Sequence, residues 1–212
     1  MSGRKDSGRK TRQMPLTIRN NSSLIIDSLC DQARGNGIAV VGLYCDFLAQ
    51  HEQSTTNMLG AILKQFVGRL GIPRHVREAF QNAKNEFGGR GLLLPDMVDM
   101  LNKTIASLPR VFICIDALDE STAKNRRELL QSMREIVRVS PNTRVLLTGR
   151  PHIDDEIVKY FTEALRIPLS PTRADIESYL EMRLHGDTDP NAMDDELRAD
   201  ITRIVPEKIS ER

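Results

Sequence analysis

The stretch that decides the fold is VFICIDALDE, residues 111–120, in which five apolar residues lead directly into Asp116 and two further acids follow at Asp119 and Glu120. A short, continuous apolar run is typical of a strand that is buried on both faces of a parallel sheet. Ligands of such sheets bind outside the carboxyl ends of the strands, where Asp116 is expected. The pattern therefore predicts the acidic half of a nucleotide-hydrolysis site, with a solvated acidic loop after a core strand as the alternative.

The three acids and one arginine are the candidate site residues. A carboxylate at Asp116 can hold Mg²⁺, through water, while the metal bridges the phosphates of a nucleotide. Asp119 and Glu120 lie one turn further on, and one of them could orient or deprotonate the attacking water. A second buried-strand pattern, RVLLTGRP at residues 144–151, ends in a small polar residue, a glycine and Arg150. An arginine at a strand edge can stabilise charge on a terminal phosphate, or it can simply end the strand.

Elsewhere in the chain, buried-strand patterns alternate with amphipathic helical patterns. The expected strands are residues 38–47, 111–115, 144–149 and, as a shorter fourth, 164–169. The expected helices are residues 22–34, 55–70, 75–87, 95–108 and 124–138, then a helix that begins at Pro171 and a last one that runs from about 191 to a break near Pro206. Strands separated by helices are joined by crossover connections, so we expect an α/β fold with a doubly wound parallel sheet.

The composition excludes several classes of protein. Apolar residues make up 40% of the 212 residues and no stretch is long enough to cross a bilayer, so we expect a globular cytoplasmic protein that does not contact a membrane. Three scattered cysteines and four histidines show no metal-ligand spacing. Residues 1–19 carry six basic side chains and one acidic one, so nucleic-acid contact is expected, if anywhere, only in this tail.

Three segments together carry a resemblance to a known family: VFICIDALDE, NTRVLLTGRPHI (142–153) and IPLSPTRADIESYLEMRL (167–184). They resemble the NACHT-type (STAND) signal-transduction NTPases, and most of all the nephrocystin-3-like N-terminal domain of fungal NLR-like proteins. SSLIIDSL and VVGLYCDF extend the likeness to about residues 22–209. The resemblance implies a P-loop NTPase-like fold that binds ATP and Mg²⁺.

The resemblance also implies a role for each candidate residue. Asp116 would be the Mg²⁺ residue of the Walker B motif, and Asp119 and Glu120 would be its catalytic acids. Arg150 would be the sensor arginine. Family members continue past a segment like IVPEKISER (204–212), so we expect a fragment, a truncated gene model or a decayed relative.

The phosphate-binding half of such a site is not found. The family carries G-x-x-x-x-G-K-[ST] directly before the helix that is expected here from Ser22, but PLTIRNNSS (15–23) contains no glycine and no lysine. Glycine permits close backbone approach and lysine supplies charge, so this segment cannot cradle phosphates. GRKDSGRKT (3–11) reads G-x-x-x-x-G-R-K-T, which is one residue longer than this motif, and we interpret it as a solvated basic tail. MPLTIR (14–19) could replace the central strand that precedes the loop, although Pro15 limits it.

The expected organisation is a disordered basic tail over residues 1–19, a truncated NACHT-like nucleotide-binding domain over 20–169, and the start of a helical subdomain over 170–212. The expected function is a partial ATP-binding signalling module with Walker B and a sensor arginine, in which nucleotide binding and hydrolysis are weak or lost. The first alternative is a non-catalytic interaction or decoy fragment that binds related full-length NLR-like proteins. The second is a poorly folded product without a role.

Overall fold

The computed structural model describes residues 21–33, 37–85, 91–185 and 194–210. The candidate phosphate-binding segments and the basic tail therefore lie almost entirely outside the described residues. The chain divides into two units, Met1–Glu163 and Ala164–Arg212. The first unit contains the sheet, and the described part of the second comprises an extended segment and two helices.

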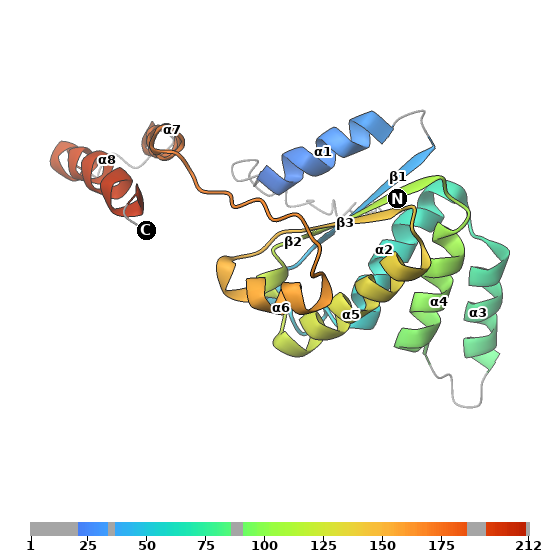
Figure 1. The fold of residues 1–212 in the computed structure, drawn as a ribbon. Coiled ribbons are helices and arrows are strands. Elements are labelled where there is room, and N and C mark those ends of the chain that lie inside the picture. Colours follow the sequence, from blue (N-terminus) through green and yellow to red (C-terminus); the bar gives the residue numbers. More distant parts are fainter. Residues whose placement is uncertain (1–20, 34–36, 86–90, 186–193, 211–212) are drawn as a thin grey trace, which may run out of the picture. The chain divides into compact units, whose positions relative to one another are not determined.

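A parallel sheet of three strands forms the centre of the first unit (Figure 1). The strands are β1 (Ile38–Tyr44), β2 (Arg110–Asp116) and β3 (Thr143–Leu147), in the order β1-β2-β3. Gly42 lies opposite Cys114, which in turn lies opposite Leu146. Three of the expected strands are thus confirmed, and VFICID is the central strand of the sheet that the structure describes.

Helices cover both faces of this sheet (Figure 1). On one face lies α1 (Asn21–Ala33), whose Ile26 packs with Val40 and Cys114. The other face is covered by α2 (Thr55–Leu70), α4 (Leu94–Ile105) and α5 (Ala123–Val139). Adjacent strand residues point to opposite faces, which is why apolar residues run continuously along β1 and β2. This architecture confirms the doubly wound parallel α/β class and fits an incomplete P-loop NTPase-like fold.

The structure describes further helices in each of the two units. In the first unit, α3 (Arg74–Asn85) packs against α4, and α6 (Asp154–Tyr160) packs against α5. Three short 3₁₀ helices are η1 (Phe47–Ala49), η2 (Leu118–Glu120) and η3 (Pro151–Ile153). In the second unit, α7 (Arg173–His185) packs against α8 (Asp195–Ser210). None of the described helices is long and apolar enough to cross a membrane.

Three expectations for the end of the chain are wrong. Residues 164–169 form no strand, and Leu165, Ile167 and Leu169 are 87%, 68% and 63% exposed. An apolar run becomes a strand only where another strand pairs with its backbone. The first helix after Ser170 begins at Arg173, not at Pro171. The last helix continues through Pro206, whose ring is buried, so packing offsets the hydrogen bond that proline cannot make.

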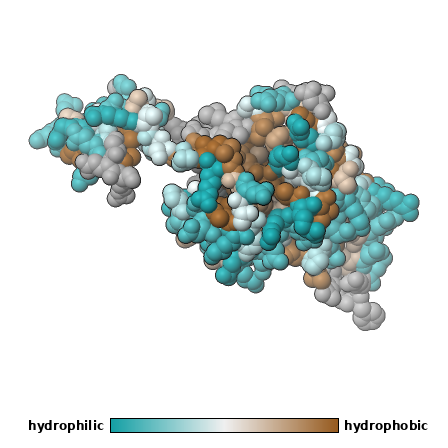
Figure 2. Space-filling model, viewed as in Figure 1, coloured by the Kyte–Doolittle hydropathy of each residue, from teal (hydrophilic) through white to brown (hydrophobic). Residues whose placement is uncertain are grey.

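The surface of the first unit in the view of Figure 2 is mostly hydrophilic, with hydrophobic residues exposed in its upper part. An apolar depression on this unit is lined by Leu29 of α1, Phe112 of β2 and Leu146 of β3. It lies along β3, which pairs with β2 on one side and with no strand of the described residues on the other. The apolar lining of this depression indicates that the described helices cover the sheet incompletely.

At the outer edge of β1, where the described residues contribute no strand, a side chain of α2 binds the backbone. Gln65 of α2 accepts a hydrogen bond from the Gly42 N–H at 3.0 Å and donates one to the Gly42 carbonyl oxygen at 2.7 Å. A carboxamide carries the same donor and acceptor as a peptide group, so Gln65 satisfies the backbone as a neighbouring strand would. Unpaired strand edges invite association with other chains, and this contact removes part of that edge.

Gln65→Met is expected to lower the free energy of unfolding by about 2 kcal/mol, because it leaves the Gly42 N–H and carbonyl groups half-buried without partners. Urea denaturation followed by circular dichroism measures the change. Lys64→Met, at an exposed position on the same helix, is the matched control and should shift the free energy by less than about 0.5 kcal/mol. Equal effects of the two substitutions would contradict the role given to Gln65.

Candidate functional site

The four candidate residues lie together at the carboxyl ends of the strands. Asp116 is the last residue of β2, Asp119 and Glu120 belong to η2 directly after it, and Arg150 lies between β3 and η3. Parallel strands end at the same edge of a sheet, so two segments 30 residues apart in the sequence meet here. The sequence expectation about where these residues lie agrees with the structure, while the chemistry assigned to them remains a prediction.

The Asp116 carboxylate is almost buried, with 8% of the residue exposed. Its Oδ1 accepts a hydrogen bond from the hydroxyl group of Thr148, the first residue after β3. The carbonyl oxygen of Asp116 accepts from the Cys45 N–H at 3.0 Å. Sequence reasoning noted Thr148 only as a small polar residue at a strand end and gave it no role.

The turn after Asp116 has an unusual backbone conformation. Ala117 has φ +53°, the left-handed region that residues other than glycine rarely adopt. Its N–H donates to the Thr148 hydroxyl oxygen at 3.1 Å, and the next N–H, of Leu118, donates to the Thr148 carbonyl oxygen at 2.9 Å. Leu118 itself is fully buried in the main core. These contacts fix the direction in which the chain enters η2.

Asp119 and Arg150 contact each other. Asp119 Oδ1 accepts from the Arg150 N–H at 3.2 Å, and its Oδ2 lies 3.4 Å from Arg150 Nε. The Asp119 side chain is 7% exposed, whereas that of Arg150 is 74% exposed. A Cβ at the neighbouring Gly149 would lie 2.6 Å from Cδ1 of Ile153, so a larger residue there would require the Ile153 side chain to move. The exposed guanidinium group can swing away from Asp119 at little cost.

Glu120 is tied to the loop that follows β1. Its Oε2 accepts from the Phe47 N–H at 3.2 Å, and its carbonyl oxygen accepts from the Gln50 side chain at 2.5 Å. Asp46 caps the same loop by accepting from the Leu48 N–H at 2.9 Å. The carboxyl ends of β1, β2 and β3 are therefore linked into one hydrogen-bonded unit.

Cys45, the first residue after β1, lies close enough to the acids of the site for their charges to shift the pKa of its thiol. Burial raises the pKa of its thiol from 9.0 to about 12, and the negative charges of Asp116, Glu120 and Asp119 add to the effect. Arg126 acts in the opposite direction. Cys45 thus stays protonated at neutral pH and is not a nucleophile here.

This raised pKa predicts a pH dependence of stability. A thiol with its ordinary pKa loses its proton in the unfolded chain above pH 9, while Cys45 in the folded chain keeps it up to about pH 12. The stabilisation that the protonated Cys45 thiol gives the folded state is complete below pH 9 and is lost as the pH rises towards 12. At pH 10 the free energy of unfolding has fallen by about 1.4 kcal/mol for this reason. The difference in free energy of unfolding between the unsubstituted protein and Cys45→Ala should shrink by that amount between pH 8 and pH 10. A difference that does not change with pH would contradict it.

The donor set at this edge fits only one kind of metal site. Among the described residues, no group of three His, Cys, Asp or Glu side chains could hold a metal ion. One carboxylate with a free oxygen suits Mg²⁺ that takes its other ligands from water and nucleotide phosphates. The residues therefore fit Mg²⁺ that arrives with a nucleotide, bound through Asp116, and do not fit a metal site built by protein alone.

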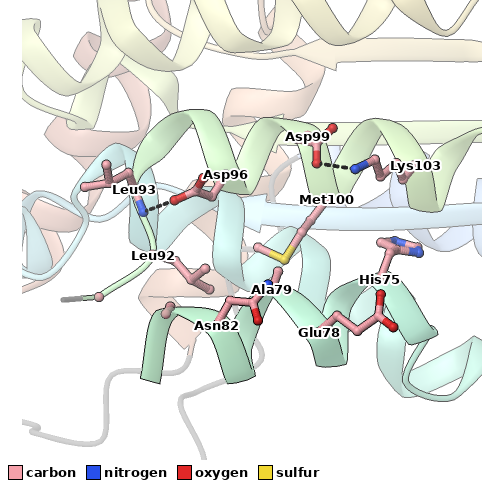
Figure 3. A pocket seen from close by; sticks show the side chains of 12 residues that line it. His75, Glu78, Ala79, Asn82, Leu92, Leu93, Asp96, Asp99, Met100 and Lys103 are labelled. Atoms are coloured by element: carbon pink, nitrogen blue, oxygen red, sulfur yellow. Dashed lines mark hydrogen bonds and ion pairs between the residues drawn. The ribbon is translucent and has the colours of Figure 1, made fainter. Parts of the chain in front are cut away.

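A separate cavity of about 470 Å³ lies between α3 and α4 (Figure 3). Its carboxylates already have partners, because Asp96 accepts from the Leu93 N–H at 2.9 Å and Asp99 accepts from Lys103 Nζ at 2.7 Å. None of the four candidate residues lines it. This cavity is therefore not part of the site at the ends of the strands.

A parallel sheet with helices on both faces, and with acids and an arginine at the carboxyl ends of its strands, defines the class of this domain as doubly wound α/β. The chain matches the family model described as Nephrocystin 3, N-terminal, over residues 21–150 of its 212 residues. It belongs to this family. The matched range contains the whole described sheet and all four candidate residues. Among curated proteins nothing matches the chain.

Three solved structures resemble the chain weakly. The ORC1 protein of Aeropyrum pernix in complex with DNA has a TM-score of 0.49 at 16% identity, over 90% of this chain and 45% of its own. A Walker-type ATPase of Pyrococcus abyssi has a TM-score of 0.40 at 12% identity, over 96% of this chain and 68% of its own. PCH-2 of C. elegans has a TM-score of 0.30 at 13% identity, over 79% of this chain and 48% of its own. The chain thus spans less than half the length of the first of them.

Proposed function

We propose that this chain is a partial NACHT-type ATP-binding module of the kind found in fungal NLR-like signalling proteins. The observation that supports it is the meeting of Asp116, Asp119, Glu120 and Arg150 at one edge of the parallel sheet, within a Nephrocystin 3, N-terminal domain. The helices after residue 170 are proposed to be the start of the helical subdomain that responds to the nucleotide.

Each side chain has a proposed task. Asp116 holds Mg²⁺, which when bound neutralises charge on the nucleotide phosphates. Glu120 and Asp119 orient the attacking water and accept its proton. Arg150 turns from Asp119 to the terminal phosphate, which is feasible because an exposed ion pair contributes only about 0–1 kcal/mol.

The affinity of this site for Mg-ATP is proposed to be low. The sequence contains no G-x-x-x-x-G-K-[ST], and backbone N–H groups with a lysine normally supply most contacts to the phosphates. The acids alone repel the phosphates unless Mg²⁺ lies between them. Hydrolysis is accordingly proposed to be very slow or lost.

Titration with Mg-ATP, followed by calorimetry and by NMR chemical shifts, tests the proposal. The expected dissociation constant is millimolar or weaker, with shifts at the carboxyl ends of the strands that disappear in Asp116→Ala. A micromolar dissociation constant that is lost in Asp116→Ala would overturn the proposed loss of phosphate binding. The absence of any difference between the unsubstituted protein and Asp116→Ala would overturn the nucleotide site itself.

A second candidate function is a non-catalytic fragment that binds full-length NLR-like relatives. The observation that favours it is the extended segment of the second unit, in which Leu165, Ile167 and Leu169 are all strongly exposed. Exposed apolar side chains in a row are typical of a contact surface. Co-purification with a tagged full-length relative, unaffected by Asp116→Ala but lost in Ile167→Asp, is the expected result. A monomer that binds no relative would contradict it.

A further inference from the structure

We propose that Thr148 is a positioning residue of this site, whose hydroxyl group holds the Asp116 carboxylate so that one carboxylate oxygen remains for Mg²⁺. This inference deepens the proposed function and rests on it. Thr148 is neither an acid nor a base, and it acts through Asp116. Its role follows from the hydrogen bonds that converge on one side chain.

The hydroxyl group of Thr148 is used twice. It donates to Asp116 Oδ1 and accepts from the Ala117 N–H at 3.1 Å. A hydroxyl group is both donor and acceptor, so it can join an acidic side chain to the backbone that follows it. None of the described residues donates a hydrogen bond to Asp116 Oδ2, which leaves that oxygen available.

The backbone of Thr148 fixes where this hydroxyl group lies. Its N–H donates to the carbonyl oxygen of Ile115 at 3.0 Å, and its carbonyl oxygen accepts from the Leu118 N–H at 2.9 Å. These bonds attach Thr148 to the chain on both sides of Asp116, to Ile115 in β2 and to Leu118 at the start of η2. The position of the hydroxyl group is therefore set by the sheet and not by a flexible loop.

The same contacts hold the turn that carries the other acids. Ala117 adopts a left-handed conformation that is strained for a residue other than glycine, and the hydrogen bonds from its own N–H and from that of Leu118 hold it there. This turn leads directly to Asp119 and Glu120. Without the hydroxyl group, Asp116 can change rotamer and the turn loses one of its two bonds to Thr148.

Groups that orient a metal ligand without touching the metal typically change metal affinity by about 10–100-fold. The decisive comparison is Thr148→Val, which keeps the shape but removes the hydroxyl group, against Thr148→Ser, which keeps the hydroxyl group. Thr143→Val, at the start of β3, is the matched control, because the Thr143 hydroxyl group is buried and has no hydrogen-bond partner among the described residues. It removes a buried hydroxyl group without breaking a contact.

The first readout needs no nucleotide. Three-bond NMR couplings of Asp116 report whether its side chain occupies one rotamer or several. We expect one rotamer in the unsubstituted protein, Thr148→Ser and Thr143→Val, and averaging in Thr148→Val. Averaged couplings in the unsubstituted protein, or an unchanged single rotamer in Thr148→Val, would overturn the inference. The measurement on the unsubstituted protein stands even if a variant does not fold.

The second readout is the ratio of ATP affinities with and without Mg²⁺. This ratio is expected to fall towards 1 in Thr148→Val and to stay near its original value in Thr148→Ser and Thr143→Val. A ratio of 1 in the unsubstituted protein contradicts the proposed function, while the Asp116 couplings still decide whether Thr148 positions the carboxylate. A preserved ratio in Thr148→Val contradicts the inference alone.

Discussion

Leu59→Ala is expected to lower the free energy of unfolding by about 3 kcal/mol, within the range of about 2–5 kcal/mol for this substitution in a core. Leu59 lies in α2, is 0% exposed, and belongs to the main core between the sheet and the helices α2, α4 and α5. Protein interiors are close-packed, so the neighbours only partly fill the space that the lost carbon atoms leave. Urea denaturation measures the loss.

The matched control is Leu70→Ala on the same helix. Leu70 is 49% exposed, so the same atoms are removed from a position that packs little. The expected change is below about 0.5 kcal/mol. If both substitutions had small and similar effects, the core that carries the site would not be packed as described. A broad transition without cooperativity would instead favour the poorly folded product.

The helices and strands of the core could be predicted because their patterns are strong. VFICI is continuously apolar since β2 is buried on both faces, and the fully buried Leu59, Ile62 and Phe66 repeat at helical spacing along α2. Ser54 also marks the start of α2, where its side chain accepts a hydrogen bond from the Asn57 N–H at 3.2 Å.

Short or unpaired segments could not be predicted in this way. The seven residues of α6 make barely two helical turns, too few to show a period. Residues 164–169 have the composition of a strand, yet composition does not show whether a neighbour will pair with the backbone. The expected helix break at Pro206 failed for a related reason, because a buried proline ring is a matter of tertiary packing.

For the candidate site, too, the sequence predicts the positions of some residues but not the contacts between them. The acids and Arg150 could be placed at the carboxyl ends of strands, because parallel strands end at one edge. The sequence could not show that Asp119 contacts Arg150, or that Glu120 accepts from the loop after β1. The role of Thr148 depends on the register of β2 against β3, which no local pattern contains.

A partly buried ion pair lies next to the acidic turn of the site. Arg126 of α5 and Glu156 of α6 are joined by Nε and Oε2 at 2.7 Å, and their side chains are 11% and 20% exposed. Arg126 also donates to the carbonyl oxygen of Ser121 at 3.0 Å, directly after η2. It therefore holds α6 and the end of the acidic turn to the same helix.

Arg126→Met is expected to lower the free energy of unfolding by about 3–5 kcal/mol, because it leaves the Glu156 carboxylate buried without its counter-charge. Glu156 Oε1 already has no hydrogen-bond partner among the described residues, so the carboxylate has little other compensation. Combining Arg126→Met with Glu156→Leu removes both charges and should recover most of the loss, since a buried pair exchanged for apolar side chains is often neutral. Urea denaturation of the four proteins of this double-mutant cycle gives the coupling energy.

The exposed pair of Arg74 with Glu78 on α3 is the control for this cycle. Its Nε–Oε1 distance of 2.6 Å is as short, but the Arg74 side chain is 90% exposed, so Arg74→Met should lower the free energy of unfolding far less than Arg126→Met does. Similar losses from Arg126→Met and Arg74→Met would show that burial does not decide the strength of the inner pair. A double variant as unstable as Arg126→Met would assign the loss to packing around the arginine stem. Recovery in the double variant, with little effect at Arg74, would show that the charge pair itself joins α5 to α6 behind the acidic turn.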